Sequence, residues 1–235
     1  MTHKNLERLR LLSFAALIVM VCAGTADARS RKRNRDRDRD REPQSATTGT
    51  FDYYMLALSW APDFCALPNV PKDPRECGAG RRVNFIVHGL WQQNEQSRGP
   101  QHCGSGSPVS QDIVRVMLNY MPTEGLIQHE WTNHGTCSGL SAADYFAAVR
   151  KARDSIKLPP DFVAPSQQME LSPATIDAKF AAANPTFPKS AFKASCQNGA
   201  LQEARICFSK NLSPRACTAS AGECSAPTMI IRPVR

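Results

Sequence analysis

Apolar and polar positions divide residues 51–235 into strand-like runs at both ends and helical repeats in the middle. FDYYMLALSW at residues 51–60 is aromatic and apolar without helix breakers, and VNFIVH at residues 83–88 is rich in β-branched side chains. Both runs therefore predict buried strands. Residues 201–208 and 228–234 predict two late strands.

The middle of the chain predicts helices. Apolar residues recur with a helical period over residues 109–121, and residues 126–137 continue in the same way. Ser141 and Asp144 form a capping-box pattern that opens a helix over residues 142–156. A further helix begins at Ser172-Pro173 and runs through Ala182. We expect loops over residues 62–82 and 95–107, and an α+β domain overall.

The first 50 residues predict export and a polar spacer. Residues 1–28 have the pattern of a signal peptide: a basic start, 13 apolar residues at Leu11–Ala23, and Ala26-Asp27-Ala28 as the cleavage site. The alternative is an uncleaved anchor helix. Residues 29–50 predict a disordered segment whose Arg/Asp-rich part has eight basic and four acidic residues. That part is either a solvated spacer or a basic arm that holds RNA or an anionic surface by phosphate contacts.

Eight cysteines remain once the predicted signal peptide is removed. An even number in an exported chain predicts a disulfide framework, although eight cysteines allow 105 pairings. No CxxC pair occurs in the sequence, which disfavours a zinc ribbon or a thioredoxin-like site. The cysteines are Cys65, Cys77, Cys103, Cys137, Cys196, Cys207, Cys217 and Cys224.

Two short motifs contain the candidate chemistry: FIVHGLW at residues 85–91 and HEWTNHGTC at residues 129–137. Histidine both takes and gives a proton near neutral pH, so two of them can supply a general base and a general acid. His129 and His134 are five residues apart, not four as in the zinc signature HExxH, so metal binding is disfavoured. Glu130 is one helical turn from His134 and is expected to orient it or raise its pKa.

These motifs, together with the strand at residues 51–60, resemble the two active-site segments and first strand of the ribonuclease T2 family. The resemblance covers Phe51 to the C-terminus. It implies a single disulfide-bonded α+β domain, over residues 51–235, with an antiparallel sheet packed with helices. It also implies a metal-independent endoribonuclease of low base specificity. Such an enzyme cleaves RNA by transphosphorylation to a 2′,3′-cyclic phosphate.

The resemblance assigns a role to each matching residue. His88 and His134 would be the catalytic pair, with His134 as the base and His88 as the acid, and Glu130 would support the transition state. His129 would bind phosphate, and Trp91 would stack on a base. The resemblance also implies a bridge between Cys103 and Cys137, and C-terminal disulfides among the cysteines from Cys196 to Cys224.

Three positions depart from the family pattern, and two of them belong to the expected substrate-binding set. Asn133 replaces a common lysine, which predicts slower turnover. Gln93 replaces an aspartate linked to base recognition, which puts purine preference in doubt. Gln92 replaces a proline and is expected to loosen a turn.

The sequence therefore predicts a secreted or periplasmic ribonuclease whose partner is RNA. It predicts no metal or other cofactor, no membrane association after signal cleavage, and a monomer. The main alternative is a catalytically weak or inactive relative that binds RNA or a protein, and Asn133 favours it. An unrelated disulfide-rich binding module and a zinc hydrolase are the remaining alternatives.

Overall fold

The computed structural model describes residues 48–222 and 224–234. The expected signal peptide and nearly all of the Arg/Asp-rich segment lie outside the described residues. Among the described residues, no helix combines the length and apolar character needed to span a bilayer.

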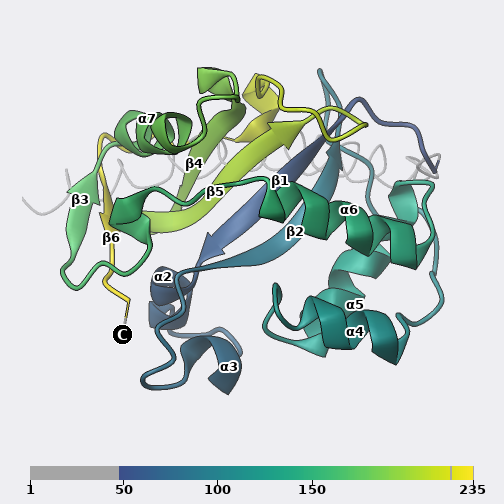
Figure 1. The fold of residues 1–235 in the computed structure, drawn as a ribbon, viewed down its shortest axis with the longest axis horizontal. Helices are drawn as coiled ribbons and strands as arrows, with labels where there is room; N and C mark the ends of the chain where they lie inside the picture. Colours follow the sequence, from purple (N-terminus) through teal and green to yellow (C-terminus); the bar gives the residue numbers. More distant parts are fainter. Residues whose placement is uncertain (1–47, 223, 235) are drawn as a thin grey trace, which may run out of the picture. The chain divides into compact units, whose positions relative to one another are not determined.

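One six-stranded sheet forms the centre of the fold (Figure 1). Its order is β2-β1-β5-β6-β3, and β4 also pairs with β5. The predicted antiparallel sheet is confirmed except at β5 and β6, which run parallel where Ala200 pairs with Ile230. The strands are β1 (Tyr53–Trp60), β2 (Phe85–Gln93), β3 (Met169–Leu171), β4 (Phe192–Gln197), β5 (Ala200–Phe208) and β6 (Met229–Ile231).

Helices pack around the sheet, and two of them begin at the expected caps. Ser141 accepts a hydrogen bond from the backbone of Asp144, and Ser172 accepts one from that of Thr175. The α-helices are α2 (Ala61–Ala66), α3 (Pro74–Cys77), α4 (Gln111–Met117), α5 (Glu124–Asn133), α6 (Ala142–Asp154) and α7 (Pro173–Ala183). The 3₁₀ turns are η1 (Gly135–Cys137), η2 (Pro160–Phe162), η3 (Lys189–Ala191) and η4 (Ala219–Ala221).

The loop expected over residues 62–82 is wrong in part, because it contains α2 and α3. Proline lies in the first turn of both helices, where its missing N–H costs nothing. Asp73 also caps α3 by accepting a hydrogen bond from the backbone N–H of Arg75 at 2.7 Å. Cys65 and Cys77 then join the two helices in a disulfide.

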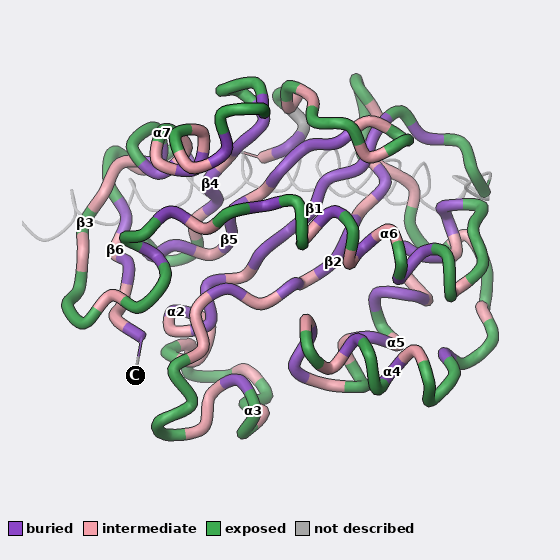
Figure 2. Tube along the Cα trace, in the orientation of Figure 1, coloured by how far each residue is buried: buried purple, intermediate pink, exposed green. Residues whose placement is uncertain are grey.

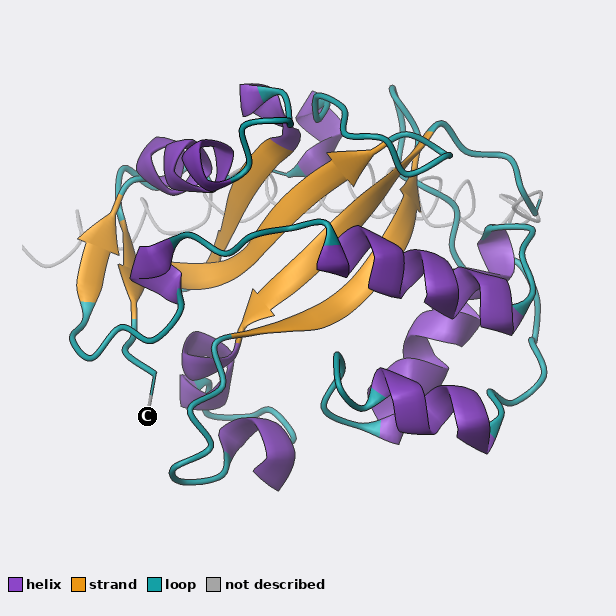
Figure 3. Cartoon of the chain, in the orientation of Figure 1, coloured by secondary structure: helices purple, strands orange, loops and turns teal. Residues whose placement is uncertain are grey.

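The main core lies between the sheet and α6 and α7, which cross one face of it (Figure 3). Alternate residues of β1, including Leu56 and Leu58, point into this core and meet Phe146 and Phe180. Figure 2 shows the central strands as almost continuously buried. The opposite face of β1, β2 and β5 carries the polar side chains described below.

Two backbone irregularities correct the sequence expectations around the histidines. β2 does not end at His88 but continues to Gln93, and the pairing with β1 shifts so that His88 has no partner between Val87 and Gly89. A bulge of this kind re-aims a side chain. The helix expected over residues 126–137 ends at Asn133, and His134 caps it with φ −121° and ψ −50°.

Four disulfides close the fold: Cys65–Cys77, Cys103–Cys137, Cys196–Cys224 and Cys207–Cys217. The implied Cys103–Cys137 bridge and the C-terminal group are confirmed. Cys103–Cys137 ties the long loop after β2 to η1, directly after His134. Cys207–Cys217 ties the segment after β5 back to that strand.

Candidate active site

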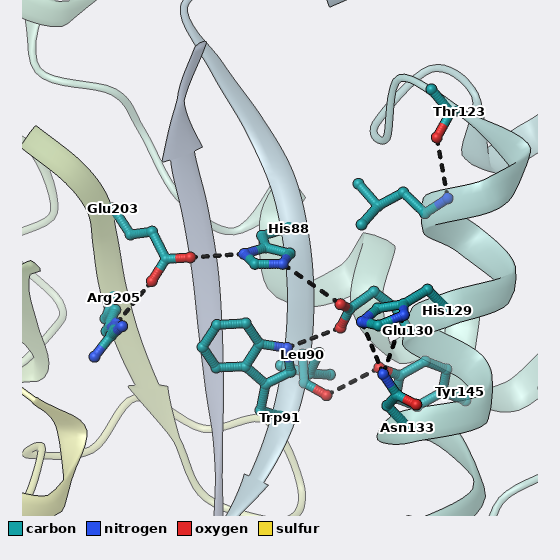
Figure 4. Close-up of polar contacts among 11 residues, drawn as sticks. His88, Leu90, Trp91, Thr123, His129, Glu130, Asn133, Tyr145, Glu203 and Arg205 are labelled. Carbon is teal, nitrogen blue, oxygen red and sulfur yellow. Dashed lines mark hydrogen bonds and ion pairs between the residues drawn. The ribbon is translucent and has the colours of Figure 1, made fainter. Parts of the chain in front are cut away.

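His88 is the centre of a chain of polar contacts that crosses from β5 to α5 (Figure 4). Its Nδ1 lies 2.7 Å from Oε1 of Glu203, and its Nε2 lies 3.6 Å from Oε1 of Glu130. The His88 side chain is 34% exposed, whereas both carboxylates are 1% exposed. Burial favours a neutral ring, but the hydrogen bond and charge of Glu203 and the charge of Glu130 outweigh it and raise the pKa of His88.

Glu130 projects from α5 toward β2. Its Oε2 accepts a hydrogen bond from Nε1 of Trp91 at 2.8 Å. Burial raises the pKa of Glu130 to about 7, against the opposing effects of His88 and Trp91. This close approach requires glycine at position 89, because a Cβ there would lie 2.0 Å from Oε2 of Glu130.

His134 is buried beside the same indole. Its ring centroid lies 5.4 Å from that of Trp91, with 31° between the planes, and His88 packs on Trp91 edge-on at 5.0 Å. Burial and then the neighbouring charge of His88 lower the pKa of His134 to about 4. The two environments therefore shift the pKa values of the two histidines in opposite directions.

The expected pair of Glu130 and His134 is wrong. Among the described side chains, the polar partners of Glu130 are His88 and Trp91. The N–H of His134 still donates to the Glu130 carbonyl at 3.0 Å, but His134 is the C-cap with a non-helical φ of −121°, so its side chain is not placed as in a regular helix. Accordingly the pKa of His134 is lowered, not raised.

The expected substrate-binding residues lie on α5 and β2. His129 is exposed on α5, and the side-chain nitrogen of Asn133 lies 2.7 Å from its Nε2. Trp91 lies between the two catalytic candidates, with its N–H committed to Glu130. Gln93 is two residues further along β2, at the end of the strand, and so shares a face with Trp91. Gln92 is buried within β2, so the loosened turn expected there is wrong.

The sequence interpretation missed Glu203 and Arg205. Glu203 Oε2 accepts a hydrogen bond from Nε of Arg205 at 2.9 Å. Arg205 donates in turn to the backbone oxygen of Ala221 at 2.7 Å. A signal was present in the sequence: two charged residues at alternate positions of the apolar run ALQEARICF must share one face of a buried strand, where charges require partners.

A cavity of about 420 Å³ opens next to His88 on this face of the sheet. Its walls include Ser59 of β1, Leu201 of β5, Leu126 of α5 and Glu76 of α3. Burial raises the pKa of Glu76 to about 7. The cavity volume is in the range of small-ligand sites, and its lining mixes apolar side chains with polar and charged ones.

No group of three or more histidine, cysteine, aspartate or glutamate side chains within residues 48–222 and 224–234 has an arrangement that could hold a metal ion. The candidate residues are instead connected by hydrogen bonds and ring contacts. Metal independence stays a prediction.

Comparisons with known proteins agree on one family. The chain is 38% identical over 120 residues to a "Probable ribonuclease" of Haemophilus influenzae, covering 46% of this chain and 44% of that protein. It is 39% identical over 97 residues to a "Ribonuclease" of Aeromonas hydrophila, covering 41% of this chain and 42% of that protein. Both matches therefore span less than half of the relative.

Solved structures show the same fold. An RNase-related protein from Calystegia sepium aligns with a TM-score of 0.61 at 20% identity, covering 79% of this chain and 98% of that one. RNase NT in complex with 5′-AMP aligns with a TM-score of 0.60 at 20% identity, covering 78% and 99%. The sequence pattern of the ribonuclease T2 family matches residues 51–217, which include every histidine and carboxylate described above. The chain belongs to the ribonuclease T2 family.

Proposed function

We propose that the protein is an exported endoribonuclease that cleaves single-stranded RNA without a metal ion and with low base specificity. The 2′-hydroxyl of the substrate attacks the adjacent phosphorus. A 2′-O–P bond forms, the P–O5′ bond breaks, and the product is a 2′,3′-cyclic phosphate. Family membership and the relatives called ribonuclease support this proposal.

The observation that carries the proposal is the packing of His88 and His134 on one indole, with ring centroids 5.0 and 5.4 Å from that of Trp91. His134, whose pKa is lowered to about 4, is neutral and accepts the proton of the 2′-hydroxyl. The charges of Glu203 and Glu130 raise the pKa of His88, and this favours the protonated ring that gives its Nε2 proton to the departing 5′-oxygen. General acid and general base each contribute about 10²–10⁴-fold.

The remaining residues act on the phosphate and the base. Glu130, buried beside His88, supports the charge that develops during the reaction. His129 and Asn133 on the outer side of α5 donate hydrogen bonds to phosphoryl oxygens. A base stacks on the exposed part of Trp91, and such stacking contributes about 1–3 kcal/mol regardless of the base.

The disulfides support export as part of the proposal. Four bridges among the described residues are typical of proteins from oxidising compartments. A secreted or periplasmic location agrees with the signal peptide predicted at residues 1–28. We propose a monomer with RNA as its partner.

The test is cleavage of a uridine dinucleotide in excess EDTA by the purified protein with its four disulfides formed. We expect a 2′,3′-cyclic phosphate product by mass spectrometry. His88→Ala and His134→Ala should each reduce kcat/KM by at least about 10²-fold. A requirement for added metal, or a product lacking the cyclic phosphate, would overturn the mechanism.

The alternative is a catalytically weak or inactive relative that binds RNA or a protein, and Asn133 favours it because an amide brings no full charge to the phosphate. Absence of cleavage by the correctly bridged protein, together with retained RNA binding, would favour this alternative.

A further inference from the structure

We propose that Glu203, held in place by Arg205, is a positioning residue that fixes the tautomer and orientation of the His88 ring. This inference rests on the proposed function, because it concerns the proton that His88 gives to the leaving group. Neither residue belongs to the two active-site motifs, and both come from β5, more than 60 residues after HEWTNHGTC.

The geometry defines which nitrogen reacts. A buried carboxylate 2.7 Å from Nδ1 accepts its hydrogen, so the Nδ1–H form is retained whether His88 is charged or neutral. Nε2 is then the nitrogen that gains and loses the catalytic proton. Figure 4 shows Nε2 on the side of α5 and Glu203 on the opposite side of the ring.

Arg205 keeps Glu203 ionised and immobile. Burial alone raises the pKa of Glu203, but the contacts with His88 and Arg205 outweigh it and lower that pKa. The guanidinium of Arg205 is fixed by the carbonyls of Ala221 and Gly222, at 2.7 and 3.3 Å, and lies 5.9 Å from the ring of Trp91. The carboxylate therefore has one rigid orientation in which to hold the imidazole.

Other charged groups also face His88, and the test must distinguish the effect of Glu203 from theirs. Glu130 is the nearest, but it lies beyond Nε2, at 3.6 Å, and does not contact Nδ1. The groups that act on His88 from the surrounding elements are Glu203 and Arg205 on β5, Glu130 and His129 on α5, His134 at the end of α5, and Glu76 on α3.

The experiment compares two substrates with wild type and Glu203→Gln. The first is a uridine dinucleotide, whose 5′-oxygen must be protonated as it leaves. The second is uridine 3′-(4-nitrophenyl phosphate), whose leaving group departs without a proton. Glu170→Gln is the matched control, because Glu170 is exposed on β3 of the same sheet.

We expect Glu203→Gln to lower dinucleotide cleavage at pH 7 by about 10- to 100-fold, a part of the usual contribution of general-acid catalysis. Cleavage of the nitrophenyl substrate should fall less than about threefold. The alkaline limb of the dinucleotide pH profile should move to lower pH by about one unit, because loss of the carboxylate charge lowers the pKa of His88. Glu170→Gln should behave as wild type.

Equal losses on the two substrates, or an unmoved alkaline limb, would overturn the inference while leaving the ribonuclease proposal intact. Inactivity of the wild type would overturn the ribonuclease proposal. If Glu203→Gln did not fold, ¹⁵N NMR of the histidine-labelled wild-type protein would still test the inference by identifying the tautomer of His88. The Nδ1–H tautomer of neutral His88 is the expected result, and the Nε2–H tautomer would contradict it.

Discussion

At the scale of single residues, the site depends on environments that separate two chemically identical side chains. His88 is half-buried between two carboxylates, whereas His134 is buried against an indole, with Nδ1 lacking a hydrogen-bond partner among the described residues. The two environments shift the pKa of the same imidazole in opposite directions, which supports the proposed roles of His88 as acid and His134 as base. Neither motif predicts the environment of His88, because the carboxylate that contacts its Nδ1 belongs to Glu203 on β5.

A broad pH profile follows from these shifts. The proposed mechanism requires neutral His134 and protonated His88, so kcat/KM should be lost as the pH falls through the His134 pKa of about 4. The kcat/KM should fall again as the pH rises through the pKa of His88, which is raised above the ordinary 6.5. Dinucleotide cleavage between pH 3 and 9 would measure both limbs, and an alkaline limb below 6.5 would contradict the assignment.

Asn133→Lys should raise kcat/KM by about 3- to 10-fold. A lysine places a full positive charge next to His129, where the phosphate is proposed to bind, and tenfold corresponds to about 1.4 kcal/mol of transition-state stabilisation. Steady-state kinetics on the dinucleotide would measure it. Asn119→Lys adds the same charge at an exposed position after α4 and should have no effect. An unchanged or lower rate in Asn133→Lys would contradict the role given to this position.

At the scale of elements, the site depends on the meeting of β2 and α5. The bulge at His88 and the glycine that follows it bring the strand close enough for Glu130 to reach both His88 and Trp91. The end of α5 then places His134 outside the helical repeat and against the indole. Small changes in either backbone should therefore reduce activity more than stability.

Gly89→Ala should lower kcat/KM by about 10²-fold. The new Cβ would lie 2.0 Å from Glu130 Oε2 and 2.5 Å from Trp91 Nε1, so the carboxylate and the indole must separate. Displacements of about 1 Å at a catalytic group cost rates of this order. Gly104→Ala is the control, since a Cβ there meets no atom within 4 Å. Kinetics and thermal unfolding would be compared, and a fully active Gly89→Ala would exclude a role for this contact.

At the scale of the whole molecule, distant segments hold the sheet and its short helices together. Arg232, directly after β6, donates a hydrogen bond to the carboxylate of Asp63 in α2, and the Asp63 side chain is 4% exposed. The backbone carbonyl of Arg232 accepts a hydrogen bond from Nε1 of Trp60 at 3.1 Å. The contact with Asp63 closes the chain over 169 residues of separation. It connects the C-terminal strand to the wall of the cavity beside His88.

Arg232→Ala should lower the free energy of unfolding at pH 7 by about 1–2 kcal/mol. The substitution leaves the buried charge of Asp63 unpaired. Because Arg232 is partly exposed, the loss of stability is smaller than the usual loss on breaking a fully buried ion pair. Burial raises the pKa of Asp63, so the difference from wild type should shrink as the pH falls and the carboxyl becomes neutral. Urea unfolding at pH 7 and pH 4 would measure this, and a difference that grew in acid would contradict it.

The sequence by itself determined the longer elements and named most residues of the candidate site. Apolar alternation, capping residues and prolines are local signals, and they predicted β1, α6, α7 and β5 within a few residues. The two histidine motifs likewise carried the resemblance to the family. The short strands β3 and β4 were missed, because three to six residues carry too little periodicity to distinguish them from loops.

Only the tertiary structure decided which groups act on one another. Glu130 contacts His88 and Trp91 of β2 instead of His134, and these contacts exist only because β2 packs against α5. Glu203 met His88 because β1 aligns β5 with β2 across the sheet, which no local pattern encodes. Protonation depends on burial and on charges a few ångströms away, and both arise only when segments distant in sequence pack together.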